Sequence, residues 1–250
     1  MNKEFFLKTP NIPTNEVSCV IVDYRINKKS EDFLKNHGIT VLKTAKLNTL
    51  YESVDGHPDM QIHHLGDNLF VCEGTLLSYY QNLIPDAKLI PGAKVSNKYP
   101  YDIALNACRA GDFLFHYFDF TDYNILEYYK TKSVKLINVK QGYSKCSICI
   151  INEKAIITSD VKIAEKANKN GLDALFYDSN QIMLKNLPKG FIGGISGLIN
   201  KNTLAINGNI EKLDENKRLL DFCQRYEVNI ISLSDEIPED IGSILPIKQL

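Results

Sequence analysis

One pattern recurs along this 250-residue sequence: a helix-forming segment is followed within a few residues by a short apolar run. Five segments have the apolar spacing, the capping residues or the terminating glycine and proline that are typical of helices: Ser30–His37, Thr75–Leu83, Thr121–Lys130, Asp160–Asn170 and Asn209–Tyr226. The runs that follow them are β-type in composition: Thr40–Ala45, Ala87–Ile90, Val134–Val139, Ala174–Tyr177 and Val228–Ser234. A unit repeated in this way indicates a repeat architecture.

A pair of β-type runs, split by a short polar turn, precedes each of the last four helices. The turns lie at residues 66–68, 109–112, 152–154 and 200–202, and such turns predict β-hairpins. The first helix has only one strand before it, Ser18–Tyr24, while a spare strand, Ser243–Ile247, follows the last unit. If these two strands pair, the chain consists of five equal units of hairpin, helix and strand.

An array whose last strand completes its first unit is a closed ring, which leaves no open sheet edges to cap. We therefore predict an α/β fold in which residues 1–250 form a single domain. It would be a five-bladed α/β propeller, with five ββαβ units around a central channel and the helices outside. The alternative is a plain α+β sheet domain, because a single sequence does not fix topology.

Charge and composition limit the partners and the compartment. The net charge is −1, and no block rich in lysine and arginine occurs, so we expect no nucleic-acid partner and no membrane partner. No apolar run reaches the roughly 18 residues that span a bilayer, and residues 1–16 lack the apolar segment of a signal peptide. Six cysteines are too few for a disulfide scaffold, so we expect reduced thiols and a cytoplasmic location.

Short motifs spread over nearly the whole chain carry a family resemblance. Pro58-Asp59 opens a predicted strand, Asp102 lies in Pro100–Ala104, and Lys145 ends Tyr143-Ser144-Lys145. Together with the order of the units, these motifs resemble those of the penteins, the guanidino-group modifying superfamily. Dimethylarginine dimethylaminohydrolase is the nearest member, and arginine and agmatine deiminases are more distant. The resemblance implies the five-unit fold and a binding cleft in the channel.

The same motifs depart from the family at the residues that carry its chemistry. The family has an acidic pair where this chain has His63-His64-Leu65, and it has a catalytic histidine in the motif that here reads Tyr143-Ser144-Lys145. The closing loop of the family carries a nucleophilic cysteine, whereas this chain has Gly242-Ser243 and no cysteine after Cys223. Because the family reaction needs a thiolate and a histidine that moves protons, the resemblance does not imply hydrolase activity.

The carboxylates that would hold a guanidinium group are kept in this chain, and they lead to the first hypothesis. We expect a degenerate pentein, a binding module or pseudoenzyme, that binds a small polar or guanidino-like metabolite in the channel without a cofactor. A homodimer stays open. The ligand-binding residues that we predict, from the matching motif positions and their neighbours, are Asp59, Asp102, His64, Tyr143, Lys145 and Ser243.

The second hypothesis is an amidinohydrolase or deiminase-type enzyme whose catalytic residues have moved. It requires a cysteine such as Cys108 or Cys146 to meet a histidine such as His63 or His116. The third is a structural or interaction protein, which only the amphipathic helices support.

Three further groups of residues have a functional and a structural interpretation. Cys146 and Cys149 form a CxxC pair in a predicted strand, where their side chains point to opposite faces, so we interpret them as core cysteines. His57, Asp59 and His63 share the parity of one predicted strand and suggest a metal site, but three ligands on one strand rarely complete a coordination shell, so we predict no metal. The glycines of Gly190–Gly197 fit no phosphate-loop spacing, and we interpret them as points of close backbone approach.

Overall fold

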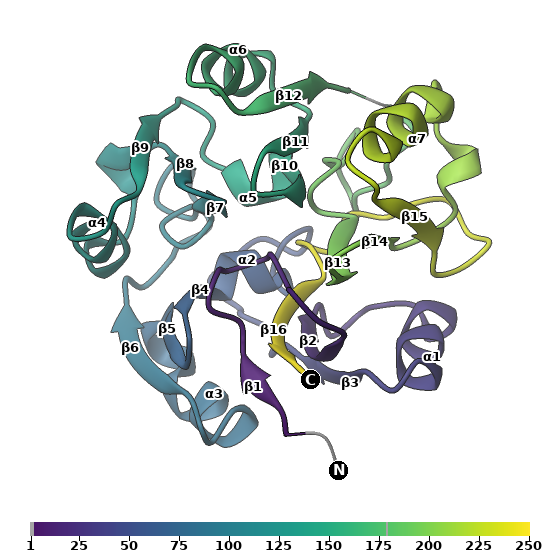
Figure 1. Cartoon of the computed structure of the whole chain (residues 1–250). Helices are drawn as coiled ribbons and strands as arrows, with labels where there is room; N and C mark the ends of the chain where they lie inside the picture. Colours follow the sequence, from purple (N-terminus) through teal and green to yellow (C-terminus); the bar gives the residue numbers. More distant parts are fainter. Residues whose placement is uncertain (1–2, 179) are drawn as a thin grey trace.

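Five small mixed sheets form a ring in the computed structural model, which describes residues 3–178 and 180–250 (Figure 1). Four of the five sheets share one plan, in which an antiparallel hairpin is followed by an outer helix and by a third strand parallel to the second. Their elements are β4 (Ile62–Gly66), β5 (Leu69–Glu73), α3 (Leu77–Leu83) and β6 (Lys88–Gly92); β7 (Cys108–Ala110), β8 (Phe113–His116), α4 (Tyr123–Lys130) and β9 (Lys135–Asn138); β10 (Ile148–Asn152), β11 (Ala155–Thr158), α6 (Val161–Lys169) and β12 (Asp173–Phe176); and β13 (Ser196–Asn200), β14 (Thr203–Ile206), α7 (Asn216–Gln224) and β15 (Asn229–Ser232).

The remaining sheet joins the two ends of the chain. The last strand, β16 (Leu245–Gln249), pairs antiparallel with β2 (Val17–Val22), so that Leu245 lies opposite Ile21. A parallel strand, β3 (Thr40–Lys43), follows through helix α1 (Lys28–Asn36), and the short β1 (Phe5–Phe6) adds to the free edge of β16. The predicted pairing of the terminal strands, and with it the closed five-unit propeller, is confirmed.

The hydrophobic core is divided into wedges between neighbouring sheets. Five buried clusters each join two adjacent units, for example the cluster that places Val20 of β2 against Ala205 of β14. The wedge between β2 and β5 contains Ile21 and Cys72, both fully buried. Because each unit buries its apolar faces only against its two neighbours, the ring must close for every unit to be covered.

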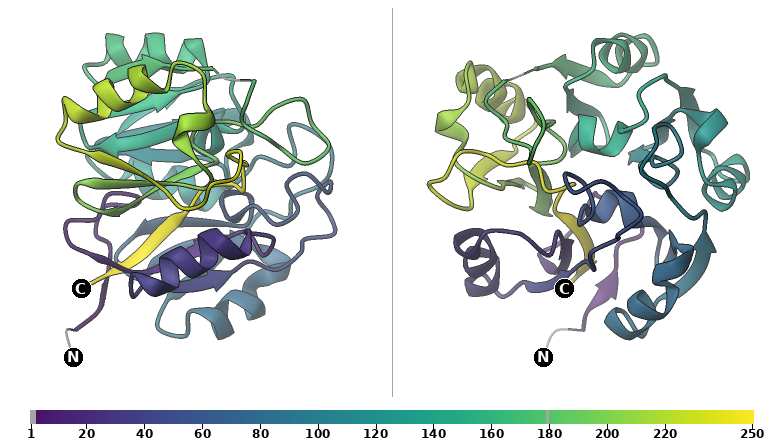
Figure 2. Two further views of the ribbon diagram at one scale, coloured as in Figure 1. Left: turned by 90° about the vertical axis from the view of Figure 1, so that its right-hand side faces the viewer. Right: turned by 180° about the vertical axis from the view of Figure 1, so that it is seen from behind.

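Two short helices, α2 (Pro58–Gln61) and α5 (Ser144–Ser147), lie near the centre of the ring (Figures 1 and 2). The first strands of neighbouring units, β7, β10, β13 and β16, lie next to one another around this centre. The longer helices cover the outside of the ring. No helix within residues 3–178 and 180–250 has the length and apolar character to cross a membrane.

The predicted hairpin turns are confirmed, but three local predictions are wrong. The helix expected at Asn209–Tyr226 is divided into a 3₁₀ turn, Ile210–Lys212, and α7, because Glu215 adopts a left-handed φ of 52° between them. His57 and Asp59 lie at the start of α2 rather than on one strand with His63. Cys146 lies in α5 and Cys149 in β10, so the CxxC pair is not within a single strand.

Candidate functional site

Asp59 lies at the centre of the ring, in the single turn of α2. Pro58 starts this turn, because its fixed φ suits the first helical position. Asp59 is only 2% exposed, and its Oδ2 accepts hydrogen bonds from the Cys146 thiol at 2.9 Å and the Ser243 hydroxyl at 3.3 Å. Burial raises the pKa of Asp59 to about 6, although His57 and Lys145 act in the opposite direction. Asp59 therefore holds its proton more strongly than an exposed aspartate does.

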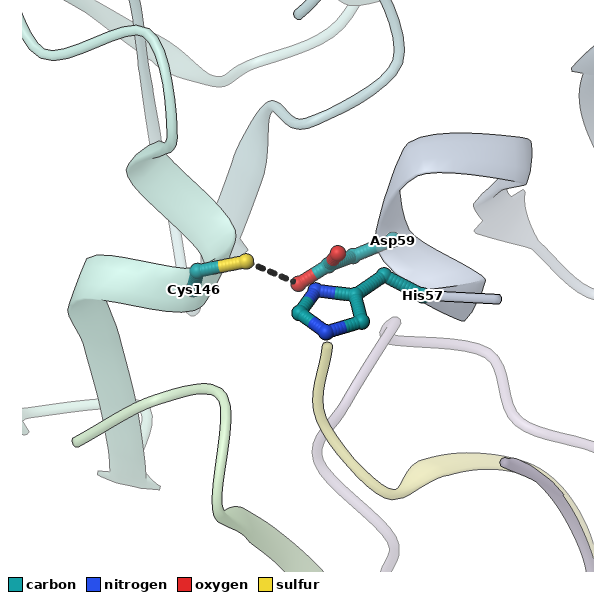
Figure 3. Close-up of side chains that lie close together, drawn as sticks. All are labelled: His57, Asp59 and Cys146. Atoms are coloured by element: carbon teal, nitrogen blue, oxygen red, sulfur yellow. Dashed lines mark hydrogen bonds between the residues drawn. The ribbon is translucent and has the colours of Figure 1, made fainter. Parts of the chain in front are cut away.

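Cys146 reaches Asp59 from α5, and Figure 3 shows the two side chains meeting from separate short helices. Asn106 holds this turn, because its Oδ1 accepts a hydrogen bond from the Lys145 backbone N–H at 2.8 Å and its Nδ2 donates to Cys146 Sγ at 3.4 Å. Burial, together with Asp59 and Asp240, raises the pKa of the Cys146 thiol well above its usual value. The thiol thus stays protonated and donates a hydrogen bond to Asp59.

Ser243 lies in the closing loop, where the resemblance placed the family's nucleophile. Its hydroxyl accepts a hydrogen bond from Lys145 Nζ at 2.8 Å and donates to the Gly193 carbonyl at 2.9 Å or to Asp59. Ser243 is fully buried and has a left-handed φ of 81°, which only its surroundings can maintain in a serine. Ser243 and Lys145 thus join the closing loop to the central carboxylate.

His57 and Asp240 form the other side of this centre. The His57 ring points towards Cys146 and Asp59 (Figure 3), and neither ring nitrogen has a hydrogen-bond partner among the described residues. Asp240 Oδ1 lies 3.9 Å from His57 Nδ1. Backbone N–H groups of Gly242 and Phe191 each donate to one Asp240 oxygen at 2.9 Å, which fixes the carboxylate, while burial raises its pKa.

The loop before β13 passes so close to Asp240 that it has no room for a side chain at Gly194. A Cβ atom at this position would lie 1.8 Å from Asp240 Oδ1. At Gly193 a Cβ would lie 2.4 Å from the Lys145 carbonyl oxygen. The interpretation of Gly190–Gly197 as points of close approach is confirmed at these two residues.

A cavity of about 290 Å³ opens beside His57, Cys146 and Asp240. Its size lies at the lower end of the range for small-molecule sites. The rest of its wall is mainly aromatic and aliphatic, and consists of Tyr51, Val54, Tyr143, Leu184, Leu187, Pro188, Lys189 and Phe191. The three polar groups are therefore placed where a small ligand could contact them.

Asp102 lies behind two of the tyrosines of this wall. The hydroxyl groups of Tyr143 and Tyr51 donate to Asp102 Oδ2 at 2.5 Å and 3.2 Å, and they also contact each other. Burial and the contacts with Asp102 raise the pKa of both phenols, that of Tyr51 to about 12, although the contact with Tyr143 lowers the pKa of Tyr51. Asp102 is fully buried, and its Oδ1 has no hydrogen-bond partner among the described residues. Asp102 thus fixes two neutral hydroxyl groups at the edge of the cavity.

A family model matches residues 21–245, and its description reads "Family of unknown function (DUF6873)". The match covers most of the chain. The chain belongs to this family. No curated protein matches the DUF6873 chain significantly.

Solved structures with the same fold match nearly the whole DUF6873 chain at low sequence identity. Inosamine-phosphate amidinotransferase from Streptomyces griseus matches with a TM-score of 0.58 and 9% identity, over 97% of each chain. Agmatine deiminase from C. jejuni matches with a TM-score of 0.54 and 10% identity, over 94% of this chain and 92% of its own. An amidinotransferase from the saxitoxin biosynthetic pathway of Microseira wollei matches with a TM-score of 0.53 and 9% identity, over 91% and 92%. The pentein fold implied by the resemblance is therefore shown.

The sequence-predicted site residues of the DUF6873 chain fall into two groups. Tyr143 lines the 290 Å³ cavity, with Asp102 behind it. Asp59, Lys145 and His64 line a separate cavity of about 20 Å³, which has room for about one water molecule. Ser243 connects Lys145 and Asp59. No hydrogen bond or ion pair among the described residues joins Asp59 directly to Asp102.

His64, which stands where the family has an acidic pair, carries no charge near pH 7. Its Nε2 lies 2.7 Å from the Asp67 carbonyl oxygen, and its ring stacks on Phe70 with centroids 4.2 Å apart. Burial lowers the pKa of His64 to about 4, so the ring is neutral near pH 7. It packs in the wall of the small cavity as an uncharged aromatic ring.

The residues considered for a relocated active site do not converge as expected. His63 faces the Tyr129 hydroxyl, and His116 lies between the Thr121 hydroxyl and the Gly142 carbonyl. Cys108 is fully buried in the wedge between β8 and β11. Cys146 instead meets His57, a pairing that the sequence interpretation did not foresee because it placed His57 on a strand.

Asp240, Tyr51 and Asn106 are the site residues that sequence reasoning missed. Asp240 lies in an irregular segment, 46 positions after Gly194, the glycine that it contacts. Tyr51 lies in a loop before α2. The one sequence signal that pointed to Asp240 was the glycine pair at 193–194. Glycines at such a position indicate that another part of the chain packs closely against the backbone there.

Proposed function

We propose that the protein binds a small organic cation with several N–H donors, of the guanidino or amidino class, in the 290 Å³ cavity. The observation that carries the proposal is the group of three buried carboxyl groups around it: Asp240 in the wall, Asp59 behind Cys146, and Asp102 behind the tyrosines. Each of them is at most 3% exposed. The basic groups that act on Asp59 and Asp240 are His57 and Lys145.

Buried carboxylates need compensation by charge or by hydrogen bonds. Oδ1 of Asp59 and Oδ1 of Asp102 have no hydrogen-bond partner among the described residues, so unused acceptor capacity lies directly behind the cavity wall, next to Cys146 and next to the two tyrosines. A guanidinium or amidinium group carries its donors in one plane and its charge over several nitrogens, which suits such acceptors. A cationic ligand would also lower the pKa of Asp59 and Asp240 and so favour their ionised forms.

Aromatic rings supply the flat walls that a planar cation prefers. The rings of Tyr143 and Phe191 both line the cavity, with centroids 6.5 Å apart and planes inclined by 31°. A delocalised cation that packs on such rings gains about 0.5–2 kcal/mol beyond the area that it buries. The names of the fold relatives, two amidinotransferases and an agmatine deiminase, agree with this ligand class by analogy only.

The experiment measures binding of arginine, agmatine and methylated arginines by isothermal titration, with neutral citrulline as the charge control. We expect at least one cation to bind and citrulline not to bind. Asp59→Asn and Asp102→Asn remove the negative charge but keep an oxygen that can accept the existing hydrogen bonds to these side chains. We expect each variant to bind the cation about 10-fold or more weakly, a loss of about 1.4 kcal/mol. Asp112→Asn is the matched control, because this side chain is 86% exposed on a hairpin turn. The proposal is wrong if no cation binds, or if the two buried variants bind as the control does.

A second candidate is an enzyme that uses Cys146 on the same ligand class. The supporting observation is that Cys146 lines the cavity with His57, whose ring nitrogen lies within 4.8 Å of its sulfur. The raised pKa of the thiol opposes it, because the thiolate is the nucleophile. Turnover of the same panel, followed by mass spectrometry and abolished by Cys146→Ser, would favour the enzyme over the binding protein.

A further inference from the structure

His57, Asp59 and Cys146 form a cluster of three different metal-ligand types at the centre of the ring. One ligand atom from each lies within 4.8 Å of the other two, and all three residues are buried (Figure 3). Two of them, His57 and Cys146, also line the 290 Å³ cavity. We propose that these residues form a three-ligand site for a zinc ion, whose fourth coordination position faces the cavity.

The donor set favours zinc among the common divalent ions. Zinc binds thiolate, imidazole and carboxylate together, and sites with three protein ligands keep the fourth position for water or another small ligand. Magnesium and calcium require oxygen ligands and would make poor use of Cys146 and His57. The three side chains come from two elements, α2 and α5, and so are not confined to one strand as the sequence interpretation assumed.

The ligand atoms have unused capacity where the ion would bind. Neither His57 nitrogen has a hydrogen-bond partner among the described residues, and Asp59 Oδ1 is also without one. His57 is 1% exposed and Asp59 is 2% exposed, so these atoms are shielded from solvent. Buried polar groups that lack partners are costly, and coordination of a cation is one way to satisfy them. The ring of His57 points towards the other two ligands (Figure 3).

Binding requires Cys146 to lose its proton. At present the thiol donates to Asp59 Oδ2 at 2.9 Å. Zinc would replace this proton: the S–H bond breaks, a sulfur–zinc bond forms, and one proton is released to solvent. The thiolate and the Asp59 carboxylate then balance the two positive charges of the ion, and a nitrogen of the His57 ring supplies the third protein ligand.

Neighbouring groups hold the ligands in the way that metal sites require. Asn106 Nδ2 donates to Cys146 Sγ at 3.4 Å, and Ser243 Oγ lies 3.3 Å from Asp59 Oδ2. Asp240 Oδ1 lies 3.9 Å from His57 Nδ1 and places a further negative charge beside the ring. These contacts restrict the orientation of each ligand before an ion arrives.

The zinc site goes beyond the proposed cation binding and would compete with it, because both use Asp59. The two proposals can fail separately. Asp102 contacts the tyrosines and lies outside the cluster. Asp102→Asn should therefore weaken binding of the organic cation and leave zinc affinity unchanged, while release of a proton from the Cys146 thiol reports zinc binding alone.

The test uses the full chain, freed of metal with a chelator and then titrated with zinc against a chromophoric competitor. We expect one zinc ion per chain, about one proton released near neutral pH, and a thiolate-to-metal absorption band when cobalt replaces zinc. Cys146→Ser and His57→Gln should each lower zinc affinity by about 100-fold or more, since the loss of supporting contacts alone costs about 10–100-fold. Cys223→Ala is the matched control, because this buried cysteine packs in the wedge between β11 and β14.

The cobalt absorption band is measured on the unmodified chain, so this part of the test does not depend on whether the variants fold. If cobalt gives no such band, or if zinc binds equally well to Cys146→Ser and to the Cys223→Ala control, the proposed site is refuted.

Discussion

Replacing Asp59 with asparagine should change how the stability of the protein depends on pH. Asp59 is buried, and burial raises its pKa from 3.8 to about 6. Asparagine has nearly the same shape, and its carbonyl oxygen can still accept the hydrogen bonds that Oδ2 takes from Cys146 and Ser243. The main difference between the two proteins is therefore the proton that Asp59 gains and loses.

The magnitude follows from the pKa shift. Between about pH 4 and about pH 6, Asp59 is ionised in the unfolded chain and protonated in the folded protein, so the folded state binds more protons and stability falls as pH rises. A shift from 3.8 to about 6 corresponds to about 3 kcal/mol at about 1.4 kcal/mol per unit. This contribution is fully present below about pH 4 and is lost above about pH 6. Asp59→Asn has no such titration.

The assay is urea unfolding of the metal-free protein and of Asp59→Asn at several pH values from about 4 to 8, with a chelator present. As pH rises across that range, we expect the free energy of unfolding of the variant to increase by about 3 kcal/mol relative to that of the unmodified protein. A constant difference between the two proteins does not affect this result. Asp240 has a raised pKa in both proteins and also raises that of Asp59, so the difference includes the coupling between these two carboxyl groups. A difference that stays constant within about 0.5 kcal/mol, or that changes in the opposite direction, refutes the assignment of Asp59 as the titrating group.

Three further outcomes can be checked on the same protein. Tyr143→Phe removes a 2.5 Å hydrogen bond to Asp102 and should lower the free energy of unfolding by about 1–3 kcal/mol; an unchanged value in urea unfolding would contradict the contact. Gly194→Ala places a Cβ 1.8 Å from Asp240 Oδ1 and should destabilise the protein by about 1–3 kcal/mol or more, which thermal unfolding would measure. All six cysteines are buried and have a raised pKa, so iodoacetamide should modify the native protein slowly. Cys146 lines the cavity and should be the first cysteine to react. Peptide mapping over time measures the order of modification, and a different first cysteine would contradict this prediction.

The ring itself could be predicted from the sequence because its signals are local. A polar turn such as residues 66–68 fixes a hairpin, and a helix stop such as Gly171 fixes where the outer helix ends. Closure of the ring was predictable for a different reason. The first unit lacked one strand and the end of the chain contained a spare one, and the pairing of β16 with β2 confirms that the spare strand completes the first unit. Each of these inferences needs only neighbouring residues or a count.

The candidate site could be predicted only in part, because single helical turns leave no periodic pattern. The four-residue helices α2 and α5 are too short for hydrophobic spacing to reveal them, so the sequence interpretation treated both segments as strand. That error separated His57 from Cys146 in the reasoning, although their ligand atoms lie within 4.8 Å. Asp240 carried no motif at all, since the glycines that accommodate it lie in another unit.

The register of the repeat supplies the signal that single motifs lacked. Every unit of the ring begins with an inner strand, and the site residue of that unit lies two or three positions before it: Asp59 before β4, Asn106 before β7, Cys146 before β10, Gly194 before β13 and Ser243 before β16. The five-fold arrangement brings these equivalent positions together at the centre of the ring, where four of them contact one another directly or through Asp59 and the fifth accommodates Asp240. Residues that are distant in sequence therefore meet because they occupy the same place in successive units, and the chemistry of the centre depends on which residue stands at each of these equivalent positions.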